Sequence, residues 1–119
     1  MLYRKLPKGE EEISILGIGT SSIQASSEKE IEEIVLTAIE NGINFFDMAS
    51  SEAKPFAAYG RAMAGVRNKI YFQIHFGANY ETGTYGWTTN LDTVRRSIDW
   101  QLKELKTDYI ESCVIHGIT

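Results

Sequence analysis

The feature that most constrains the fold is a regular alternation of short apolar runs with stretches of helical periodicity. The apolar runs lie at 15–20, 43–49, 68–77 and 108–117. Strands that alternate with helices pair in parallel, because a helix is needed to carry the chain back to the same end of the sheet. The sequence therefore predicts an α/β fold with four parallel core strands in βα units over residues 15–119.

Two of the intervening stretches carry clear helix signals. Ser27 and Glu30 have the spacing of a capping box, and Gly42 stands where a left-handed residue ends a helix. Thr89 with Asp92 predicts the start of the other helix. Its apolar stripe consists of Leu91, Val94, Ile98, Leu102 and Leu105. A shorter, alanine-rich helix is predicted over 53–65.

Two segments stand outside this alternation. Residues 2–14 hold two short extended runs around Pro7 and Gly9, which predicts a β-hairpin before the first core strand. Residues 78–89 are rich in Gly, Thr and aromatic residues and predict a loop. Its Tyr and Trp side chains either line a pocket or cover the surface of the fold.

Length and composition limit the class of protein. The 119 residues suffice for one compact domain, predicted as 1–119. The net charge is −4 with no basic stripe, which argues against nucleic acid as a partner. No apolar run approaches the ~20 residues of a membrane span, and the charged start lacks a signal-peptide core. A cytoplasmic protein is expected, with its one cysteine, Cys113, as a buried, inert thiol.

Titratable residues fall at the carboxyl ends of three predicted strands. They are Asp47, His75 and His116. Alternate residues of a strand share a face, and in parallel α/β folds the carboxyl ends of the strands carry the chemistry. We therefore expect the three side chains to meet at one rim as an active site. Two plainer readings stay open: the aspartate caps a turn, and each histidine is a hydrogen-bonded core residue.

Several stretches together resemble the aldo-keto reductases. They are "YRKLPKGEEEISILGIGT", "AIENGINFFDMA", "RNKIYF" and "SIDWQLKELKTDYIESCVIHG". The resemblance spans nearly the whole chain and is closest to a bacterial branch whose longer members often carry a ferredoxin-like tail. It implies the N-terminal half of a (β/α)8 TIM barrel with a β-hairpin at the bottom. It also implies hydride transfer between NADP(H) and a carbonyl or alcohol.

The resemblance also assigns site residues. Asp47 and His116 match the family's catalytic aspartate and histidine. Glu52 stands where the family has its catalytic tyrosine, and His75 stands where it has its lysine. Thr20 matches a small residue that touches the cofactor, as does Asp47. With two of four positions replaced, Glu52 and His75 are expected to act as a new acid–base pair.

A complete barrel of this kind needs about 250 residues, so four strands leave open sheet edges. We expect either a fragment of a longer protein or a homodimer that covers the open half-barrel. The expected ligand is a small carbonyl substrate or a nucleotide. Two alternatives to the oxidoreductase are a non-catalytic nucleotide-binding or regulatory relative and a metal site. The metal ligands would be Asp47, Glu52, His75 and His116.

Overall fold

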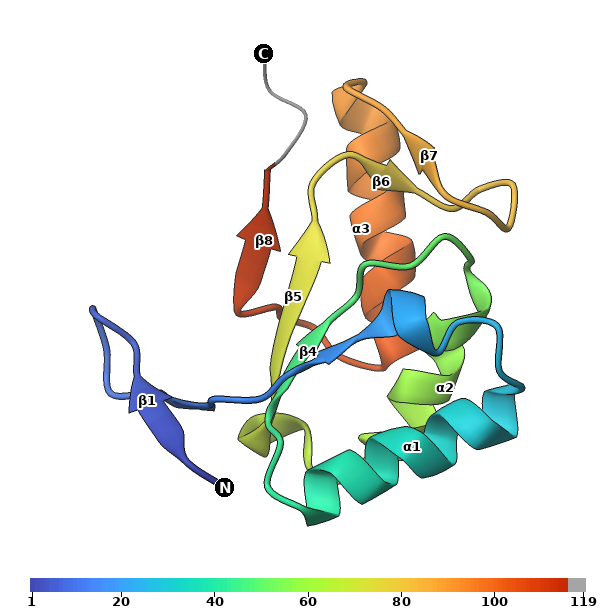
Figure 1. Cartoon of the computed structure of the whole chain (residues 1–119). Coiled ribbons are helices and arrows are strands. Elements are labelled where there is room, and N and C mark those ends of the chain that lie inside the picture. The colour runs from blue at the N-terminus through green and yellow to red at the C-terminus, as the bar shows by residue number, and fades with distance from the viewer. Residues whose placement is uncertain (116–119) are drawn as a thin grey trace.

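The structure is a computed structural model that describes residues 1–115 (Figure 1). Its strands are β1 (Tyr3–Lys5), β2 (Glu12–Ser14), β3 (Ile18–Gly19), β4 (Phe45–Asp47), β5 (Tyr71–His75), β6 (Ala78–Asn79), β7 (Gly86–Trp87) and β8 (Ser112–Val114). Its helices are α1 (Glu28–Glu40), α2 (Lys54–Ala62), α3 (Leu91–Leu105) and the 3-10 turns η1 (Thr20–Ser22) and η2 (Arg67–Lys69).

A four-stranded sheet forms the centre of the fold, in the order β3-β4-β5-β8. All three of its strand pairs are parallel, as the alternation of strands and helices predicts. The register places Gly19 beside Asp47, Asp47 beside Gln73, and Gln73 beside Ser112. The predicted α/β architecture of a partial TIM barrel is confirmed.

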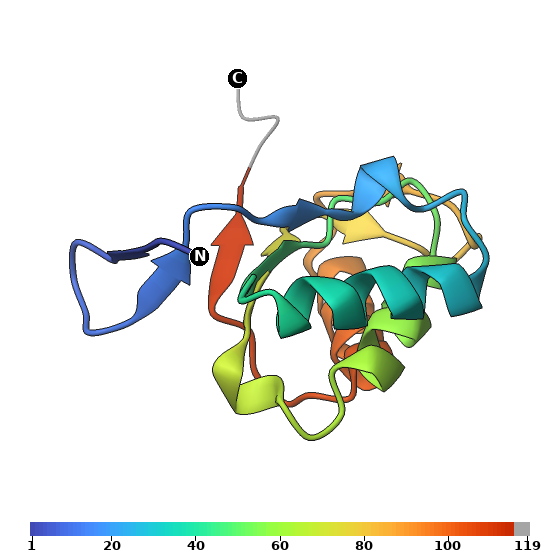
Figure 2. The same cartoon turned by 60° about the horizontal axis from the view of Figure 1, so that its bottom comes forward.

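The helices α1, α2 and α3 lie on one side of this sheet, in both views of the molecule (Figures 1 and 2). Strand residues that face the helices are buried, among them Phe46, Phe72 and Ile74. The neighbouring Phe45 and Gln73, on the opposite face, are only half-buried. The core therefore sits between the sheet and the helices. The other face of the sheet, which we call the inner face, is open.

The signals at both ends of α1 are confirmed. The hydroxyl of Ser27 accepts the Glu30 backbone N–H at 3.2 Å, and the Glu30 carboxylate accepts the Ser27 N–H at 3.3 Å. These bonds satisfy amide groups that a helix start otherwise leaves without partners. Gly42 follows the helix with φ +89°, in the region that only glycine adopts without strain.

Helix α3 differs from its prediction in its cap and in its buried line. Asn90 rather than Thr89 is the cap, because the Asn90 side chain accepts the Thr93 N–H at 3.0 Å. Leu91 is 61% exposed. The fully buried positions are Val94, Ser97, Gln101 and Leu105. The helix ends at Lys106, which adopts a left-handed φ of +55°.

Close approach of α2 and α3 depends on Gly60. A Cβ at this position would lie 2.2 Å from the backbone carbonyl oxygen of Glu104, so no larger residue fits without moving a helix. The centroid of the Phe56 ring on α2 lies 5.0 Å from that of Tyr80 and 5.2 Å from that of Trp100 on α3. These contacts fix the helices behind β4 and β5.

A charged clamp ties the start of β8 to the rest of the sheet. The Arg67 guanidinium contacts both Glu111 carboxylate oxygens at 3.0 Å and donates to the Tyr109 carbonyl at 2.7 Å. Glu111 in turn accepts the Phe72 backbone N–H at 2.9 Å. Cys113, which follows on β8, is exposed, so the prediction of a buried thiol is wrong. In the described sheet β8 is an edge strand, so no further strand lies beside it to help bury the Cys113 side chain.

The two hairpins complete the described chain. β1 and β2 pair antiparallel, as predicted for residues 2–14, and lie at the end where the core strands begin (Figure 1). β6 and β7 also pair antiparallel, within the stretch predicted as a loop. None of the helices in residues 1–115 has the length and apolar character needed to cross a membrane.

Candidate functional site

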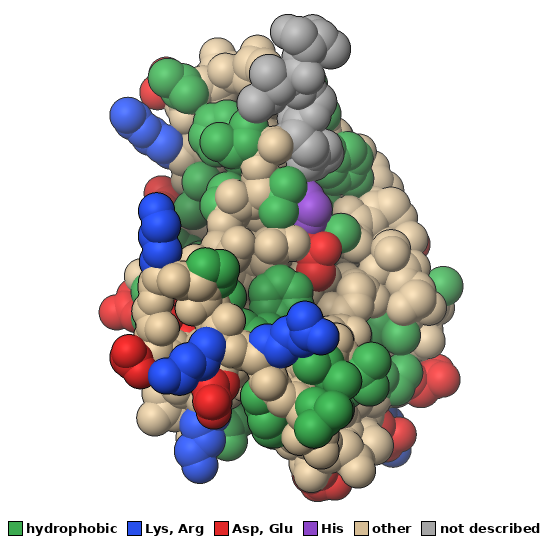
Figure 3. All heavy atoms as spheres, turned by 60° about the vertical axis from the view of Figure 1, so that its left-hand side comes forward, with side chains coloured by type: hydrophobic (Ala, Val, Ile, Leu, Met, Phe, Trp, Pro, Cys, Tyr) green, Lys and Arg blue, Asp and Glu red, His purple; other side chains and the backbone are tan. Residues whose placement is uncertain are grey.

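Strand register brings Asp47 and His75 together. Asp47 pairs with Gln73, and His75 lies two residues further along β5, so both side chains belong to the same face. Nε2 of His75 lies 2.7 Å from Oδ1 of Asp47, and the imidazole N–H donates to the carboxylate. Figure 3 shows the described histidine directly beside an acidic side chain on the molecular surface. The His75 side chain is 17% exposed and the Asp47 side chain is 30% exposed, so the pair is accessible to a ligand.

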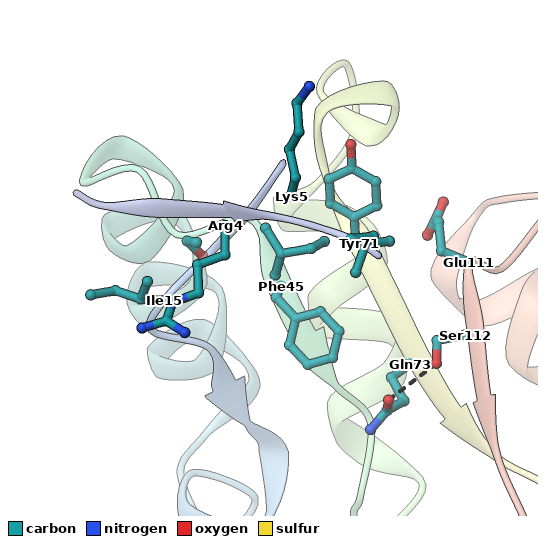
Figure 4. A pocket seen from close by; sticks show the side chains of 11 residues that line it. Arg4, Lys5, Ile15, Phe45, Tyr71, Gln73, Glu111 and Ser112 are labelled. Atoms are coloured by element: carbon teal, nitrogen blue, oxygen red, sulfur yellow. Dashed lines mark hydrogen bonds between the residues drawn. The ribbon is translucent and has the colours of Figure 1, made fainter. Parts of the chain in front are cut away.

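A row of polar side chains continues from this pair along the open face. The Ser112 hydroxyl donates to Oε1 of Gln73 at 3.1 Å, and Figure 4 shows this bond across two neighbouring strands. Asp47, Gln73 and Ser112 are consecutive partners in the register. The inner face is therefore not purely apolar.

Thr20 lies behind the pair rather than in front of it. It is 0% exposed, and its hydroxyl donates to the Asp47 carbonyl at 2.8 Å. The Thr20 hydroxyl oxygen also lies 3.2 Å from the hydroxyl oxygen of Tyr59, a residue that is also fully buried. Burial raises the pKa of Tyr59 to about 12. Thr20 supports the end of β4 and exposes no atom to which a cofactor could bind, so its predicted contact has no structural support.

Glu52 is not brought to the Asp47–His75 pair. Its backbone forms an antiparallel bridge with Thr84, and its carboxylate lies 3.9 Å from Nζ of Lys54. Both of these side chains are well exposed, so the ion pair contributes little to stability. Within residues 1–115, the Glu52 carboxylate is paired with Lys54, and this ion pair gives no support to an acid–base pair of Glu52 with His75.

The β6–β7 hairpin explains the position of Glu52. Tyr85 donates its backbone N–H to the Ser51 carbonyl at 2.8 Å, and Ala53 donates to the Gly83 carbonyl at 2.9 Å. In addition, the Tyr80 hydroxyl donates to the Ser50 carbonyl at 2.9 Å. These bonds hold the segment that follows β4 against the hairpin.

A small pocket lies where this hairpin meets the strand ends. Its volume is about 350 Å³. Of the residues that line it, His75 is the one that lies on a core strand and has a titratable side chain. Its lining residues are Ser21, Ala49, Ser50, Ser51, His75, Tyr80 and Tyr85. We call this the rim pocket. The two tyrosines were not predicted as site residues, although the aromatic loop was recognised as a candidate pocket wall.

A larger cavity lies at the other end of the strands. It has a volume of about 660 Å³ and is bounded by the β1–β2 hairpin and the inner face, including Phe45, Tyr71 and Gln73 (Figure 4). Neither Asp47 nor His75 lines it. Size alone therefore does not locate the candidate chemistry, which lies at the carboxyl ends of the strands.

Two predictions concern residues that the structure covers only in part. His116, the fourth predicted catalytic residue, lies outside the described residues. Within residues 1–115, no three His, Cys, Asp or Glu side chains gather in a way that would hold a metal ion. The described members of the hypothetical metal site, Asp47, Glu52 and His75, thus do not form one by themselves.

Comparison with known proteins agrees with this architecture. Residues 15–119 match the Aldo/keto reductase family. The uncharacterized oxidoreductase YqkF of Bacillus subtilis is 30% identical over 123 residues, which cover all of this chain and 40% of YqkF. The chain thus spans less than half the length of this curated relative.

Solved structures give the same result. The holo form of aldo-keto reductase AKR11C1 from Bacillus halodurans superposes with a TM-score of 0.85 at 27% identity, covering 100% of this chain and 41% of that one. Glycerol dehydrogenase AKR11B4 from Gluconobacter oxydans shares the fold, with a TM-score of 0.74 at 19% identity over 96% of this chain and 38% of that one. On the sequence match over 15–119 and this shared architecture, the chain belongs to the aldo/keto reductase family.

Proposed function

We propose that this chain carries part of the active site of an NADP(H)-linked oxidoreductase that interconverts carbonyl compounds and alcohols. In this site a histidine–aspartate pair stands where the family resemblance places a lysine–aspartate pair. The observation that carries the proposal is the 2.7 Å bond between His75 and Asp47 at the carboxyl ends of β4 and β5. Family membership supports the reaction class.

The pair is suited to proton handling. An imidazole has an ordinary pKa of about 6.5, so it exchanges a proton near neutral pH more readily than a lysine amine. A carboxylate hydrogen-bonded to one ring nitrogen orients the imidazole and stabilises its protonated form. Asp47 thus holds and orients His75, and His75 is the group that gives or takes the proton. A bound reduced nicotinamide would supply the hydride.

The described residues fit only one end of such a cofactor. The rim pocket offers an apolar wall and one imidazole beside the strand ends, which suits a nicotinamide ring or a carbonyl substrate. None of its lining residues is Lys or Arg, and Thr20 is buried. No cation among these residues would therefore bind the phosphates. The chain covers 40% of YqkF, and we propose that the phosphates are bound by groups other than these residues.

The test measures NADPH binding and turnover separately. NADPH is titrated into the protein with fluorescence detection, and reduction of 4-nitrobenzaldehyde is followed by NADPH absorbance. We expect His75→Gln to lower kcat/KM by about 10²-fold or more, since general acid–base groups typically contribute that much. Asp47→Asn is expected to lower kcat, because it removes the carboxylate that accepts the imidazole N–H and orients the ring.

Glu81→Gln is the matched control, because Glu81 is an exposed carboxylate paired with Arg96 and does not line the rim pocket. NADPH binding without turnover would assign the chain to the non-catalytic, nucleotide-binding class instead. Absence of both binding and turnover would rule out the proposed function for this chain.

A further inference from the structure

Two buried hydroxyl groups connect helix α2 to the end of β4. Thr20 and Tyr59 are both 0% exposed, and their hydroxyl oxygens lie 3.2 Å apart. The Thr20 hydroxyl donates to the Asp47 carbonyl at 2.8 Å. The Asp47 carboxylate in turn accepts the imidazole N–H of His75. Asp47 is thus connected through two hydrogen bonds to a phenol that does not line the rim pocket.

The direction of these bonds follows from the number of protons available. A carbonyl oxygen only accepts, so the single hydroxyl proton of Thr20 is used in its bond to Asp47. The Tyr59 hydroxyl then donates to the Thr20 oxygen, because a buried donor without an acceptor is costly and no other acceptor for it occurs within residues 1–115. Burial raises the pKa of Tyr59 to about 12, so the phenol keeps its proton near neutral pH. Each hydroxyl polarises the next, which strengthens the bond to Asp47.

Tyr59 is a firm anchor for these bonds. Its ring packs edge-on against Phe46, with 6.0 Å between centroids. The next residue of α2 is Gly60, where the helix approaches the Glu104 carbonyl of α3 so closely that a Cβ would not fit. The phenol therefore belongs to a helix whose place is set by packing, and its hydroxyl cannot move away from Thr20 without disturbing that packing.

The peptide group between Asp47 and Met48 is held on both sides. Its carbonyl accepts the Thr20 hydroxyl, and its N–H donates to the Gln73 carbonyl at 2.9 Å. The pairing of β3 with β4 ends beside Asp47, so the Thr20 side chain supplies the next contact where the strand ladder stops. A carboxylate on a fixed backbone has few directions open to it, and its 2.7 Å bond to His75 depends on that direction.

On these grounds we propose that Tyr59 is a positioning residue of the site: through Thr20 it fixes the backbone of Asp47, and thereby the hydrogen bond that orients the His75 imidazole. The role of this orientation in catalysis rests on the proposed function. The orientation itself requires neither cofactor nor substrate, so it is measured on the chain alone.

The test observes the His75 ring by NMR. Long-range ¹H–¹⁵N correlation distinguishes a protonated ring nitrogen from a bare one, and His75→Gln assigns the signals, because the chain contains two histidines. At about pH 9, well above the ordinary pKa of imidazole, we expect the proton on Nε2, the nitrogen beside Asp47. Tyr59→Phe keeps the ring and removes the hydroxyl. It should lower the ratio of Nε2-protonated to Nδ1-protonated His75 by about 2- to 5-fold, at most the effect of one hydrogen bond.

Substitutions of Thr20 test the route of the effect. Thr20→Val keeps the shape and removes the hydroxyl, so it should change the ratio more than Tyr59→Phe does. Thr20→Ser retains a hydroxyl and should leave the ratio close to that of the unaltered chain. Adding Tyr59→Phe to Thr20→Val should change nothing further, because the phenol acts through Thr20. Additive effects in the double variant would overturn the inference.

Ser97→Ala is the matched control, because it also removes a buried hydroxyl, one that donates to the Ala78 carbonyl on β6. It should lower the melting temperature and leave the ratio unchanged. An unchanged ratio in Tyr59→Phe, or an equal change in Ser97→Ala, would overturn the inference.

The two proposals fail separately. With NADPH and 4-nitrobenzaldehyde, Tyr59→Phe should lower kcat by about 2- to 5-fold and leave KM unchanged, since Tyr59 does not line the rim pocket. Absence of turnover together with the expected NMR result removes only the proposed function. Turnover with a kcat unaffected by Tyr59→Phe removes only this inference.

Discussion

Adjacent residues of β4 belong to two different environments. Phe46 points into the helix layer and is 0% exposed, while Phe45 and Asp47 point to the inner face and remain half-buried. The same contrast holds on β5, where Phe72 and Ile74 are buried and Gln73 and His75 are accessible. The helix-covered face therefore stabilises the described chain, and the inner face carries the groups with chemical capacity. Changes on the inner face can alter ligands at small cost in stability.

Replacing Phe46 should have the largest effect on stability. Phe46→Ala removes a fully buried ring and is expected to cost about 3–5 kcal/mol of unfolding free energy, from lost burial and a cavity. Phe45→Ala on the opposite face should cost about 1 kcal/mol, because that ring is already partly in contact with water. Urea unfolding followed by circular dichroism measures both changes.

The same pair of variants tests what covers the inner face. We propose that a second copy of the chain covers it, by pairing the open edges of β3 and β8, as eight strands close a barrel. The cost of Phe45→Ala would then rise with protein concentration, in step with dimer formation measured by sedimentation. An equal cost for both variants in the monomer would remove the contrast between the faces.

Buried phenols behind the sheet make stability sensitive to alkaline pH. The pKa values of Tyr59 and Tyr80 are raised by burial to about 12, above the ordinary value of 10.0. The unfolded chain therefore loses these protons first. Stability is fully present below pH 10 and is lost as pH rises towards 12, by about 2 kcal/mol per phenol.

Unfolding free energies measured between pH 9 and pH 12 check this sensitivity. Tyr59→Phe should flatten the decline, whereas Tyr109→Phe, at an exposed position, should leave it unchanged. A decline of equal size in Tyr59→Phe would show that other groups cause it.

Crowding between α2 and α3 predicts a smaller effect. Gly60→Ala forces the helices apart by its contact with the Glu104 carbonyl, at an expected cost of about 1–3 kcal/mol. Gly19→Ala is the control, because a Cβ there meets no atom within 4 Å. Thermal unfolding of the two variants gives the comparison, and equal melting temperatures would contradict the close packing of this layer.

The helix cap should have the smallest effect. Ser27→Ala removes the side-chain bond to the Glu30 N–H, which should cost about 1 kcal/mol. Its neighbour supplies the control: Ser26→Ala should be nearly neutral, since no side-chain bond of Ser26 occurs in the part of the chain that the structure describes. If Ser26→Ala proves the more harmful change, α1 begins elsewhere in solution.

Sequence reasoning succeeded where the determining contacts are local or follow from strand geometry. The Ser27 cap depends on a residue three positions away, and the meeting of Asp47 with His75 follows from parallel pairing and residue parity. The bridge between Glu52 and Thr84 could not be predicted, because it joins a hairpin with only two paired residues per strand. A strand of two residues is too short to show a periodic sequence pattern.

The prediction of the buried positions of α3 was partly wrong for a related reason. Ser97 and Gln101 occupy core positions because the Ser97 hydroxyl donates to the Ala78 carbonyl, and Gln101 donates to Ser97 at 3.2 Å. Partners supplied from β6 make these polar residues compatible with burial. Leu91, by contrast, was assigned to the core from spacing alone and is exposed. Apolar spacing cannot reveal satisfied polar groups.

The left-handed conformation of Lys106 at the end of α3 marks a position where the stability of the protein can be increased. Lys106 adopts φ +55° with a full side chain, a conformation that costs non-glycine residues about 1 kcal/mol. Glycine would occupy the same turn without that strain, while its backbone bonds to Leu102 and Lys103 remain. Lys106→Gly is thus a place to gain thermal tolerance before the more disruptive variants are tried, far from any residue of the rim pocket.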